Sequence, residues 1–279
     1  VVECTVASTV KEIAPYAFAN TGVTDVNLPS GLETIGDYAF YSATKLVDIT
    51  IPDSVKTIGV GAFRDCWKMT KATLPEGLET IGCRKLESVN IPDSVTTIGN
   101  MAFTGCALKE INISKNLTEI SIPGYTFSGC PAAITVDAAN PNYSADERGV
   151  LYNKDKSLLL HCPNFEKAFT FDINCNIDQY AFYNCANLTD VTFSYAIKKI
   201  PYAAFRNCGS LKITTVPDTV RMIDQVAFDG CGMTEFYLPD SVEYVGTQAF
   251  SSTPLTHFEF NDIVDTFKNI FSICPKLRT

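Results

Sequence analysis

Cysteine is the residue type whose spacing in this sequence first suggests chemistry. The chain has 11 cysteines among 279 residues, and thiols can pair as disulfides, bind metals or act as nucleophiles. No CxxC or CxxH pair occurs. Most of the cysteines instead stand three residues after a recurring phenylalanine, namely Cys66, Cys106, Cys130, Cys185, Cys208, Cys231 and Cys274.

This regular placement favours a column of reduced, buried thiols that act as small hydrophobic residues. Cys83 takes the same place in a shortened repeat, and Cys4, Cys162 and Cys175 also fit inward positions. Stacked strands lie about 4.7–4.9 Å apart, within Cα range of a disulfide. One or two disulfides are therefore an alternative, and a metal or catalytic role is another. Side chains in a ladder run parallel instead of facing each other, which favours the reduced column.

The two histidines, His161 and His257, do not suggest catalysis. His161 precedes Cys162, but adjacent strand residues point to opposite faces, so no Cys–His dyad is expected. Both histidines are expected at the surface or in contact with a partner. No HExxH, GxSxG, P-loop or GxGxxG motif is present. We therefore expect no enzyme activity, no cofactor and no catalytic or metal-binding residues.

Acidic residues recur in the turns of the repeat. A stacked row of carboxylates could hold Ca²⁺, but the glycine–aspartate loops of calcium-binding β-rolls are missing and aspartate is a common turn residue. The row is Asp53, Glu76, Asp93, Asp218 and Asp240. The net charge of −9 and pI near 4.8 argue against nucleic acid or an anionic membrane as partner. No apolar stretch approaches the roughly 20 residues of a membrane span.

The elements that must position these residues follow from an internal repeat. An Ala-Phe pair recurs at residues 17–18, 39–40, 62–63, 102–103, 181–182, 204–205, 227–228 and 249–250, and Phe127 and Phe271 occupy the same place. Most neighbouring phenylalanines of this set are 21 to 24 residues apart. A period of this length predicts a solenoid, in which each unit buries the apolar face of its neighbours.

One full unit begins at Leu46 and reads LVDITIPDSVKTIGVGAFRDCWK. Apolar and polar residues alternate around Ile49, as in a strand with one buried face. Pro52 then ends the strand, and turn residues follow. The frame breaks twice, with a shortened unit at 81–86 and an insert at about 137–168 that contains a predicted β-hairpin at 149–163.

The pattern LxxIxIPxxVxxIGxxAFxxC resembles the BspA-like, or Treponema-pallidum-type, leucine-rich repeat over essentially the whole chain. The resemblance implies one curved solenoid over 1–279, with about 11–12 rungs. One parallel sheet should line the concave side, with short extended or 3₁₀ segments on the convex side. It also implies a cell-surface or secreted protein of adhesin type, similar to surface proteins of host-associated microbes.

Outward positions of the predicted concave sheet are the candidate partner-binding residues. In the repeat frame they include Asp25, Asp48, Asp190, Ile213, Glu235, Tyr237, His257 and Glu259. Tyr237 is the best single anchor, because interface hot spots favour aromatic residues. The rival surface is the hairpin tip, at Asn153, Lys154, Asp155 and Lys156, since nothing in the stacking requires the insert that carries it, and exposed loop tips concentrate recognition. Both surfaces also fit simple solvent-exposed faces.

The sequence thus favours a non-catalytic scaffold that binds a protein or glycan through the concave face. A structural spacer without a ligand of its own is the alternative. The chain begins without Met or a signal segment and stops at Leu277, the first apolar position of a further unit. Because solenoid ends need capping, we expect flanking residues in the full protein or end-to-end self-association.

Overall fold

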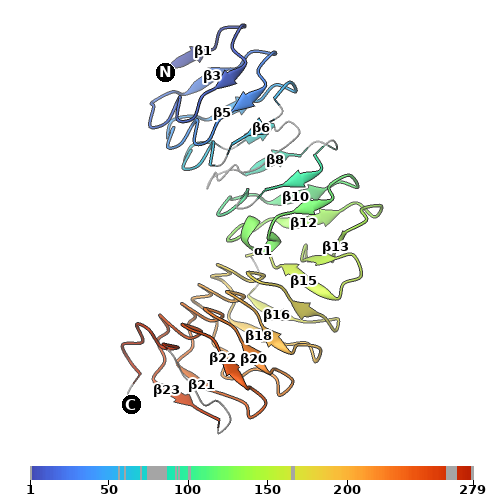
Figure 1. The fold of residues 1–279 in the computed structure, drawn as a ribbon, viewed down its shortest axis with the longest axis vertical. Coiled ribbons are helices and arrows are strands. Elements are labelled where there is room, and N and C mark those ends of the chain that lie inside the picture. Colours follow the sequence, from blue (N-terminus) through green and yellow to red (C-terminus); the bar gives the residue numbers. More distant parts are fainter. Residues whose placement is uncertain are drawn as a thin grey trace. The chain divides into compact units, whose positions relative to one another are not determined.

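The computed structural model describes residues 2–277 except 56, 60, 70, 74–86, 92, 94, 100–101, 165–166 and 262–268, and gives the backbone alone at 57, 71–73 and 90. The chain forms two compact units, Val1–Gly149 and Val150–Thr279, and their boundary falls inside the insert expected at 137–168. Each unit is a stack of rungs of about 22 residues (Figure 1). One continuous array over 1–279 stays a prediction. The shortened unit at 81–86 lies outside the described residues.

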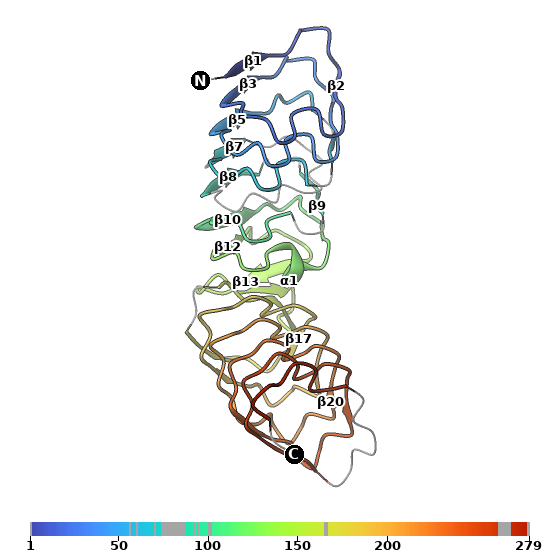
Figure 2. The ribbon, with the colours of Figure 1, turned by 90° about the vertical axis from the view of Figure 1, so that its left-hand side faces the viewer.

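The first unit has two columns of parallel strands, one of long and one of short strands, on opposite sides of the stack (Figure 2). The long strands are β1 (Glu3–Thr5), β3 (Asp25–Asn27), β5 (Asp48–Thr50), β7 (Lys71–Thr73), β8 (Ser88–Asn90), β10 (Glu110–Ile113) and β12 (Ala133–Val136). The short strands are β2 (Glu12–Ile13), β4 (Thr34–Ile35), β6 (Thr57–Ile58), β9 (Thr97–Ile98) and β11 (Glu119–Ile120). A single helical turn, α1 (Pro123–Thr126), and β13 (Tyr143–Ala145) complete it.

The second unit repeats the two columns after a hairpin. Its long strands are β16 (Ala168–Thr170), β18 (Asp190–Thr192), β21 (Glu235–Tyr237) and β23 (His257–Glu259). Its short strands are β17 (Asn176–Ile177), β19 (Lys199–Ile200), β20 (Met222–Ile223) and β22 (Tyr244–Val245). The hairpin is β14 (Leu151–Asn153) and β15 (Leu158–His161). The expected repeat solenoid, with a parallel sheet and short extended segments, is confirmed.

Alternation within each long strand sets which side chains face the core. The middle residue is buried and its two neighbours are exposed in β3, β5, β16, β18, β21 and β23. Strands pair in register with the equivalent residues of the next rung, as in Glu3 with Asp25 and Cys4 with Val26. Outward positions therefore also stack from rung to rung.

The repeat phenylalanines form the centre of each stack. Phe182, Phe205, Phe228 and Phe250 are fully buried, and successive rings are 4.7, 5.4 and 5.4 Å apart between centroids. In the first unit Phe18, Phe40 and Phe63 stack at 4.9 and 5.1 Å. The Ala-Phe repeat therefore supplies a column of stacked rings within each of these two runs of rungs.

The turns around most of the repeat phenylalanines contain two left-handed residues, two positions before the ring and two after it; Phe127 departs from this, because Tyr125 lies in α1. Around Phe182 these are Tyr180 (φ 59°) and Asn184 (φ 60°). The amides of Tyr180, Phe182 and Asn184 donate to Tyr202, Ala204 and Arg206 of the next rung at 3.2, 2.8 and 2.9 Å. Left-handed backbone costs roughly 1–2 kcal/mol for a non-glycine residue. Hydrogen bonds to the next rung hold these residues in that conformation.

The described cysteines are in the reduced, thiol form. Eight of them are buried, and Cys4 and Cys274 are half-buried. Burial raises the pKa of Cys130 and of Cys175 to about 11. Reduced thiols inside the stack match the core interpretation of the cysteine column. Cys83 lies outside the described residues.

The hairpin predicted at 149–163 is present, but the expectation that the stacking does not require it is wrong. β15 pairs antiparallel with β14 and parallel with β17, where Leu159 lies opposite Ile177. Tyr152, Leu159 and Cys162 are buried. The second hairpin strand therefore begins the short-strand column of the second unit, since its leucines supply the same buried apolar residues as the repeat.

The expected surface position of His161 is also wrong, because only 2% of the residue is exposed. It ends β15, where the chain turns into the core with Cys162. Burial lowers the pKa of His161 to about 3, so the imidazole is neutral in the folded protein. It is a core residue of the hairpin strand.

Candidate functional site

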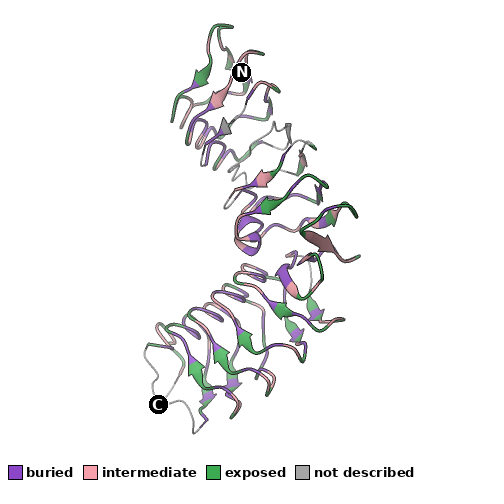
Figure 3. Ribbon diagram, turned by 45° about the vertical axis from the view of Figure 1, so that its right-hand side comes forward, coloured by how far each residue is buried: buried purple, intermediate pink, exposed green. Residues whose placement is uncertain are grey.

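The outward side chains of the long strands form what we call the strand face of each unit. Figure 3 shows exposed residues along these strands of the second unit. Seven of the eight sheet candidates are exposed as predicted: Asp25, Asp48, Asp190, Glu235, Tyr237, His257 and Glu259. Exposure of these side chains follows from the strand alternation. It makes them available for contact with a partner.

The structure brings four of the candidates together on β21 and β23, and we call these four the Tyr237 patch. Glu235 lies opposite His257, and Tyr237 lies opposite Glu259. The Tyr237 and His257 rings are 5.6 Å apart between centroids. The Tyr237 hydroxyl donates to a Glu235 carboxylate oxygen at 3.4 Å. One exposed aromatic ring thus stands between two carboxylates and an imidazole.

The backbone under the patch is fixed by the neighbouring rung. The Tyr237 amide donates to the Thr214 carbonyl at 2.7 Å, and the Thr215 hydroxyl donates to the Tyr237 carbonyl at 3.0 Å. Phe236, between the outward residues, is fully buried and stacks on Phe258 at 5.7 Å. The patch therefore lies on a rigid sheet whose core anchors every second residue.

Negative charge dominates the Tyr237 patch. The pKa of Tyr237 is raised, first by the charge of Glu235, then by partial desolvation and by Glu259. Three ion pairs of the second unit use other acids, at Lys199–Asp224, Arg206–Asp229 and Arg221–Glu243. Among the described residues, no cationic side chain pairs with Glu235 or Glu259. The patch keeps a net negative potential around its ring.

Ile213 is the sequence candidate that the structure contradicts. It was expected outward, but only 6% of it is exposed, whereas the following Thr214 is exposed. Burying an isoleucine side chain stabilises by about 1.5–3 kcal/mol, while a buried hydroxyl needs a hydrogen-bond partner. In this rung Ile213 is therefore buried in place of Thr214, the residue that the repeat frame assigns to the core. Residues 211–217 form no strand.

The remaining sheet candidates lie away from the Tyr237 patch or in the other unit. Asp190 is on β18, two rungs before Glu235. Asp25 and Asp48 line a shallow cavity of about 460 Å³ on the strand face of the first unit, together with Asn27, Ser30 and Thr50. This cavity is polar and acidic, and it contains no aromatic side chain.

The hairpin tip uses its polar groups within its own turn. Asp155 accepts hydrogen bonds from the Ser157 amide at 3.0 Å and hydroxyl at 2.7 Å, and these bonds lower the pKa of Asp155. Asn153 donates to the Ser157 hydroxyl and accepts from the Leu158 amide, both at 2.9 Å. The Lys156 ammonium lies 5.9 Å from the centre of the Tyr152 ring. The tip is therefore a closed turn whose side chains stabilise it.

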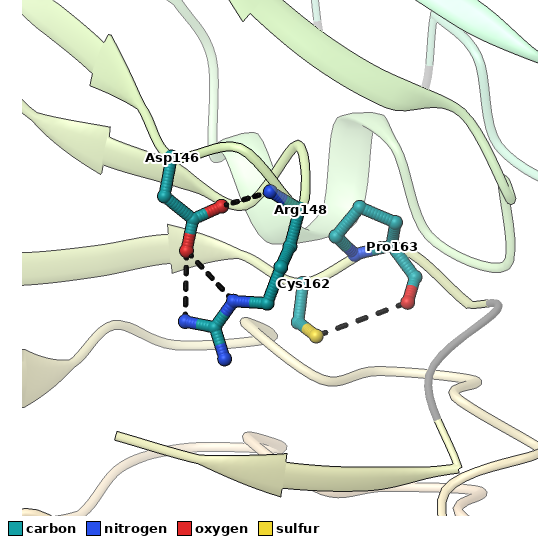
Figure 4. A network of polar contacts seen from close by, with 4 residues as sticks. All are labelled: Asp146, Arg148, Cys162 and Pro163. Carbon is teal, nitrogen blue, oxygen red and sulfur yellow. Dashed lines mark hydrogen bonds and ion pairs between the residues drawn. The ribbon is translucent and has the colours of Figure 1, made fainter. Parts of the chain in front are cut away.

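Polar contacts at the two ends of the hairpin are likewise local (Figure 4). Before the hairpin, the Arg148 guanidinium pairs with Asp146 at 2.8 Å, and the Arg148 amide donates to the same carboxylate at 3.0 Å. After it, the Cys162 thiol lies 3.8 Å from the Pro163 carbonyl oxygen. These contacts shape the chain where it enters and leaves the hairpin, and they leave no obvious reactive group.

Within the described ranges, no group of three His, Cys, Asp or Glu side chains could hold a metal ion. No helix in that part of the chain is long and apolar enough to cross a membrane. Sequence reasoning missed two exposed apolar residues on the short strands, Met222 and Tyr244, which lie opposite each other in β20 and β22. A Met and a Tyr at outward strand positions were the feature of the sequence that could have identified this pair.

Stacked rungs with a long-strand sheet, a short-strand column and a buried phenylalanine spine define a leucine-rich repeat solenoid. The family model described as the BspA type leucine rich repeat region matches in six copies over residues 1–83, 82–157 and 175–279. The chain therefore belongs to the BspA-type leucine-rich repeat family. A search of the curated proteins finds no match.

Three solved structures share the fold. The pneumococcal vaccine antigen PcpA is 21% identical with a TM-score of 0.73, and the match covers 99% of this chain but 66% of that one. A leucine rich cell surface protein from Faecalibacterium prausnitzii is 27% identical with a TM-score of 0.65, covering 96% and 92%. A leucine-rich repeat protein from Eubacterium ventriosum is 20% identical with a TM-score of 0.52, also covering 96% and 92%.

Proposed function

We propose that this protein is a cell-surface or secreted binding scaffold that holds a protein partner against the strand face of its second unit. The observation that carries the proposal is the exposed aromatic residue Tyr237, 40% of which is accessible, among charged and hydrogen-bonding neighbours on a rigid sheet. Aromatic residues flanked by polar groups are the usual anchors of protein interfaces. The surface location draws on the Faecalibacterium neighbour, which is named a cell surface protein.

The hairpin tip and a ligand-free spacer are the competing interpretations. The tip is the weaker binding candidate, because its Asn153, Asp155 and Ser157 groups already bond to one another. A spacer has no need for an aromatic residue on its strand face. A glycan remains the second ligand class for the scaffold. The mixed aromatic and charged composition of the Tyr237 patch favours a protein.

The test is capture of partners on the immobilised full chain from host extracellular proteins and from bacterial surface extracts. Wild type is compared with Tyr237→Ala, with deletion of Asn153–Ser157, and with Tyr244→Ala as a matched control. Tyr244 is 48% exposed but belongs to the short-strand column, so its loss should leave capture unchanged. We expect Tyr237→Ala to weaken capture at least about tenfold, as for an interface hot spot.

Capture that is lost only on deletion of the tip would move the site to the hairpin. If neither change affects capture, or if no partner binds, the strand-face proposal is wrong and the spacer interpretation gains. Circular dichroism of Tyr237→Ala and Tyr244→Ala should match wild type, because both tyrosine side chains are solvent-exposed. The deletion removes the Ser157 carbonyl that accepts from the Asn176 amide, so its capture is compared only if its spectrum also matches wild type.

A further inference from the structure

The charges around Tyr237 say more about the partner than the ring alone. Glu235 lies two residues before Tyr237 on the same strand, and Glu259 lies directly opposite Tyr237 on β23. Residues i and i+2 of a strand share a face, and directly opposite residues have Cβ atoms about 4.5–5.5 Å apart. Carboxylates therefore flank the ring from two directions.

These two carboxylates lack an internal counter-ion in the described part of the unit, where Lys199, Arg206 and Arg221 pair with Asp224, Asp229 and Glu243 instead. The phenol responds to the resulting field, since the pKa of Tyr237 is raised chiefly by Glu235. Anionic groups such as phosphate or sialic acid would be repelled by this surface. A cation would be attracted by the carboxylates and by the negative face of the aromatic ring.

We infer that the Tyr237 patch receives a cationic side chain of its protein partner, with arginine preferred to lysine, over the Tyr237 ring and between Glu235 and Glu259. This inference rests on the proposed function. A planar guanidinium can stack on an aromatic ring while its N–H groups bond a carboxylate, whereas an ammonium is a compact, strongly hydrated charge. His257 closes the fourth corner of the site and contacts the tyrosine ring.

The rest of the surroundings agrees with a side chain that lies across the sheet. The neighbouring rung contributes exposed Thr214 and Thr215, small polar residues that leave room above the sheet. Asp190 extends the negative charge along the same strand face two rungs away. A partner segment with basic residues at intervals would therefore meet carboxylates along its length.

The experiment measures fluorescence anisotropy of labelled peptides on the full chain at about 0.15 M salt, where exposed charges are screened beyond about 8 Å. The probes are a glycine–serine peptide carrying three spaced arginines and matched peptides with citrulline or lysine at the same places. Citrulline keeps the shape of arginine without its charge. We expect the arginine peptide to bind at least about tenfold more tightly than the citrulline peptide, with lysine between them.

Variants locate the binding. Tyr237→Ala and the double change Glu235→Gln with Glu259→Gln should each weaken arginine-peptide binding at least about fivefold, whereas Tyr237→Phe, which keeps the ring, should stay within about twofold. Tyr244→Ala and Glu243→Gln are matched controls on the short-strand side of the same rung, and they should leave binding unchanged. The glutamine changes keep side-chain shape, so the fold is preserved.

The inference is overturned if arginine and citrulline peptides bind alike, or if the control variants weaken binding as much as the patch variants, because general acidity would then explain the attraction. It is also overturned if a second copy of this chain occupies the patch, which sedimentation would show as dimerisation lost in Tyr237→Ala. A captured partner that depends on Tyr237 but tolerates the double glutamine change would remove the cation inference alone and leave the proposed function standing.

Discussion

The Sγ atom of Cys208 lies 3.0 Å from the carbonyl oxygen of Phe182, which belongs to the preceding rung. Cys231 and Phe205 repeat the contact at 3.0 Å, and Cys66 and Phe40 repeat it in the first unit at 3.1 Å. Burial and the neighbouring thiols raise the pKa of Cys208, so this sulfur stays protonated and can donate its weak hydrogen bond. The cysteine column thus joins rungs while it fills the core beside the phenylalanines.

Alkylation should distinguish buried from accessible thiols. We expect iodoacetamide to label the native protein, among the described cysteines, only at half-buried Cys4 and Cys274, since the thiolate reacts and burial suppresses it. The unfolded chain should present all 11 thiols without reductant. Mass spectrometry of both samples gives the count, and three or more disulfides, seen as six or more cysteines that react only after reduction, would contradict the reduced column.

Removal of one ring from the phenylalanine column should be severely destabilising. Phe205 is fully buried between Phe182 and Phe228, so Phe205→Ala loses buried area and leaves a cavity. We expect the free energy of unfolding to fall by about 3–5 kcal/mol. Tyr195→Ala is the control, because Tyr195 is 83% exposed and its loss should change stability by no more than about 0.5 kcal/mol. Urea denaturation followed by circular dichroism measures the free energy of unfolding of both variants. Similar losses in the two variants would contradict a stabilising role of the phenylalanine column.

Gly36 tests how closely the rungs stack. A Cβ atom at this position would lie 2.6 Å from the Pro15 nitrogen and 2.8 Å from Pro15 Cδ in the preceding rung, so the backbones would have to separate. We expect Gly36→Ala to destabilise by about 1–3 kcal/mol. Gly22→Ala is matched in the same unit, since its Cβ would meet only the end of the Lys45 side chain at 4.0 Å. Equal melting temperatures for the two variants would disprove the close approach.

His161 should make stability depend on pH. The folded imidazole stays neutral down to about pH 3, whereas the ordinary pKa is 6.5, so below pH 6.5 the unfolded chain binds a proton that the folded chain does not. The free energy of unfolding should therefore fall as pH drops below this value, by up to about 1.4 kcal/mol per pH unit. Denaturation between about pH 6.5 and 5 limits interference from carboxylates. His161→Gln should lose this slope, while His257→Gln, at an exposed position, should retain it; an unchanged slope in His161→Gln would assign the dependence elsewhere.

Much of this fold could be predicted from the sequence, because equivalent residues of successive repeats take equivalent positions in the stack. The Ala-Phe period predicts the aromatic spine, and alternation in β21 and β23 predicts that Glu235, Tyr237, His257 and Glu259 share one face. Ile213 was mispredicted because the frame assigns direction by position, whereas apolar burial decided it here. His161 was mispredicted because the alternation of a strand assumes that one of its faces is exposed, whereas Leu159, Leu160 and His161 are all buried in β15. The hydrogen bonds that Asp155 and Asn153 make within the tip could not be predicted, because the hairpin has no equivalent in the repeat unit.

The direction of the turn hydrogen bonds has a consequence for biosynthesis. Amides at Ala203, Phe205 and Asn207 donate to Gln225, Ala227 and Asp229, residues that are translated later. A rung that has just left the ribosome therefore lacks the inter-rung acceptors for these amides, and only bonds within the turn, such as that from the Arg206 amide to the Ala203 carbonyl, act on its left-handed residues until about 22 more residues emerge. Each turn gains its inter-rung hydrogen bonds only when the next rung has been translated. The nascent chain therefore contains one incomplete turn throughout translation of a unit.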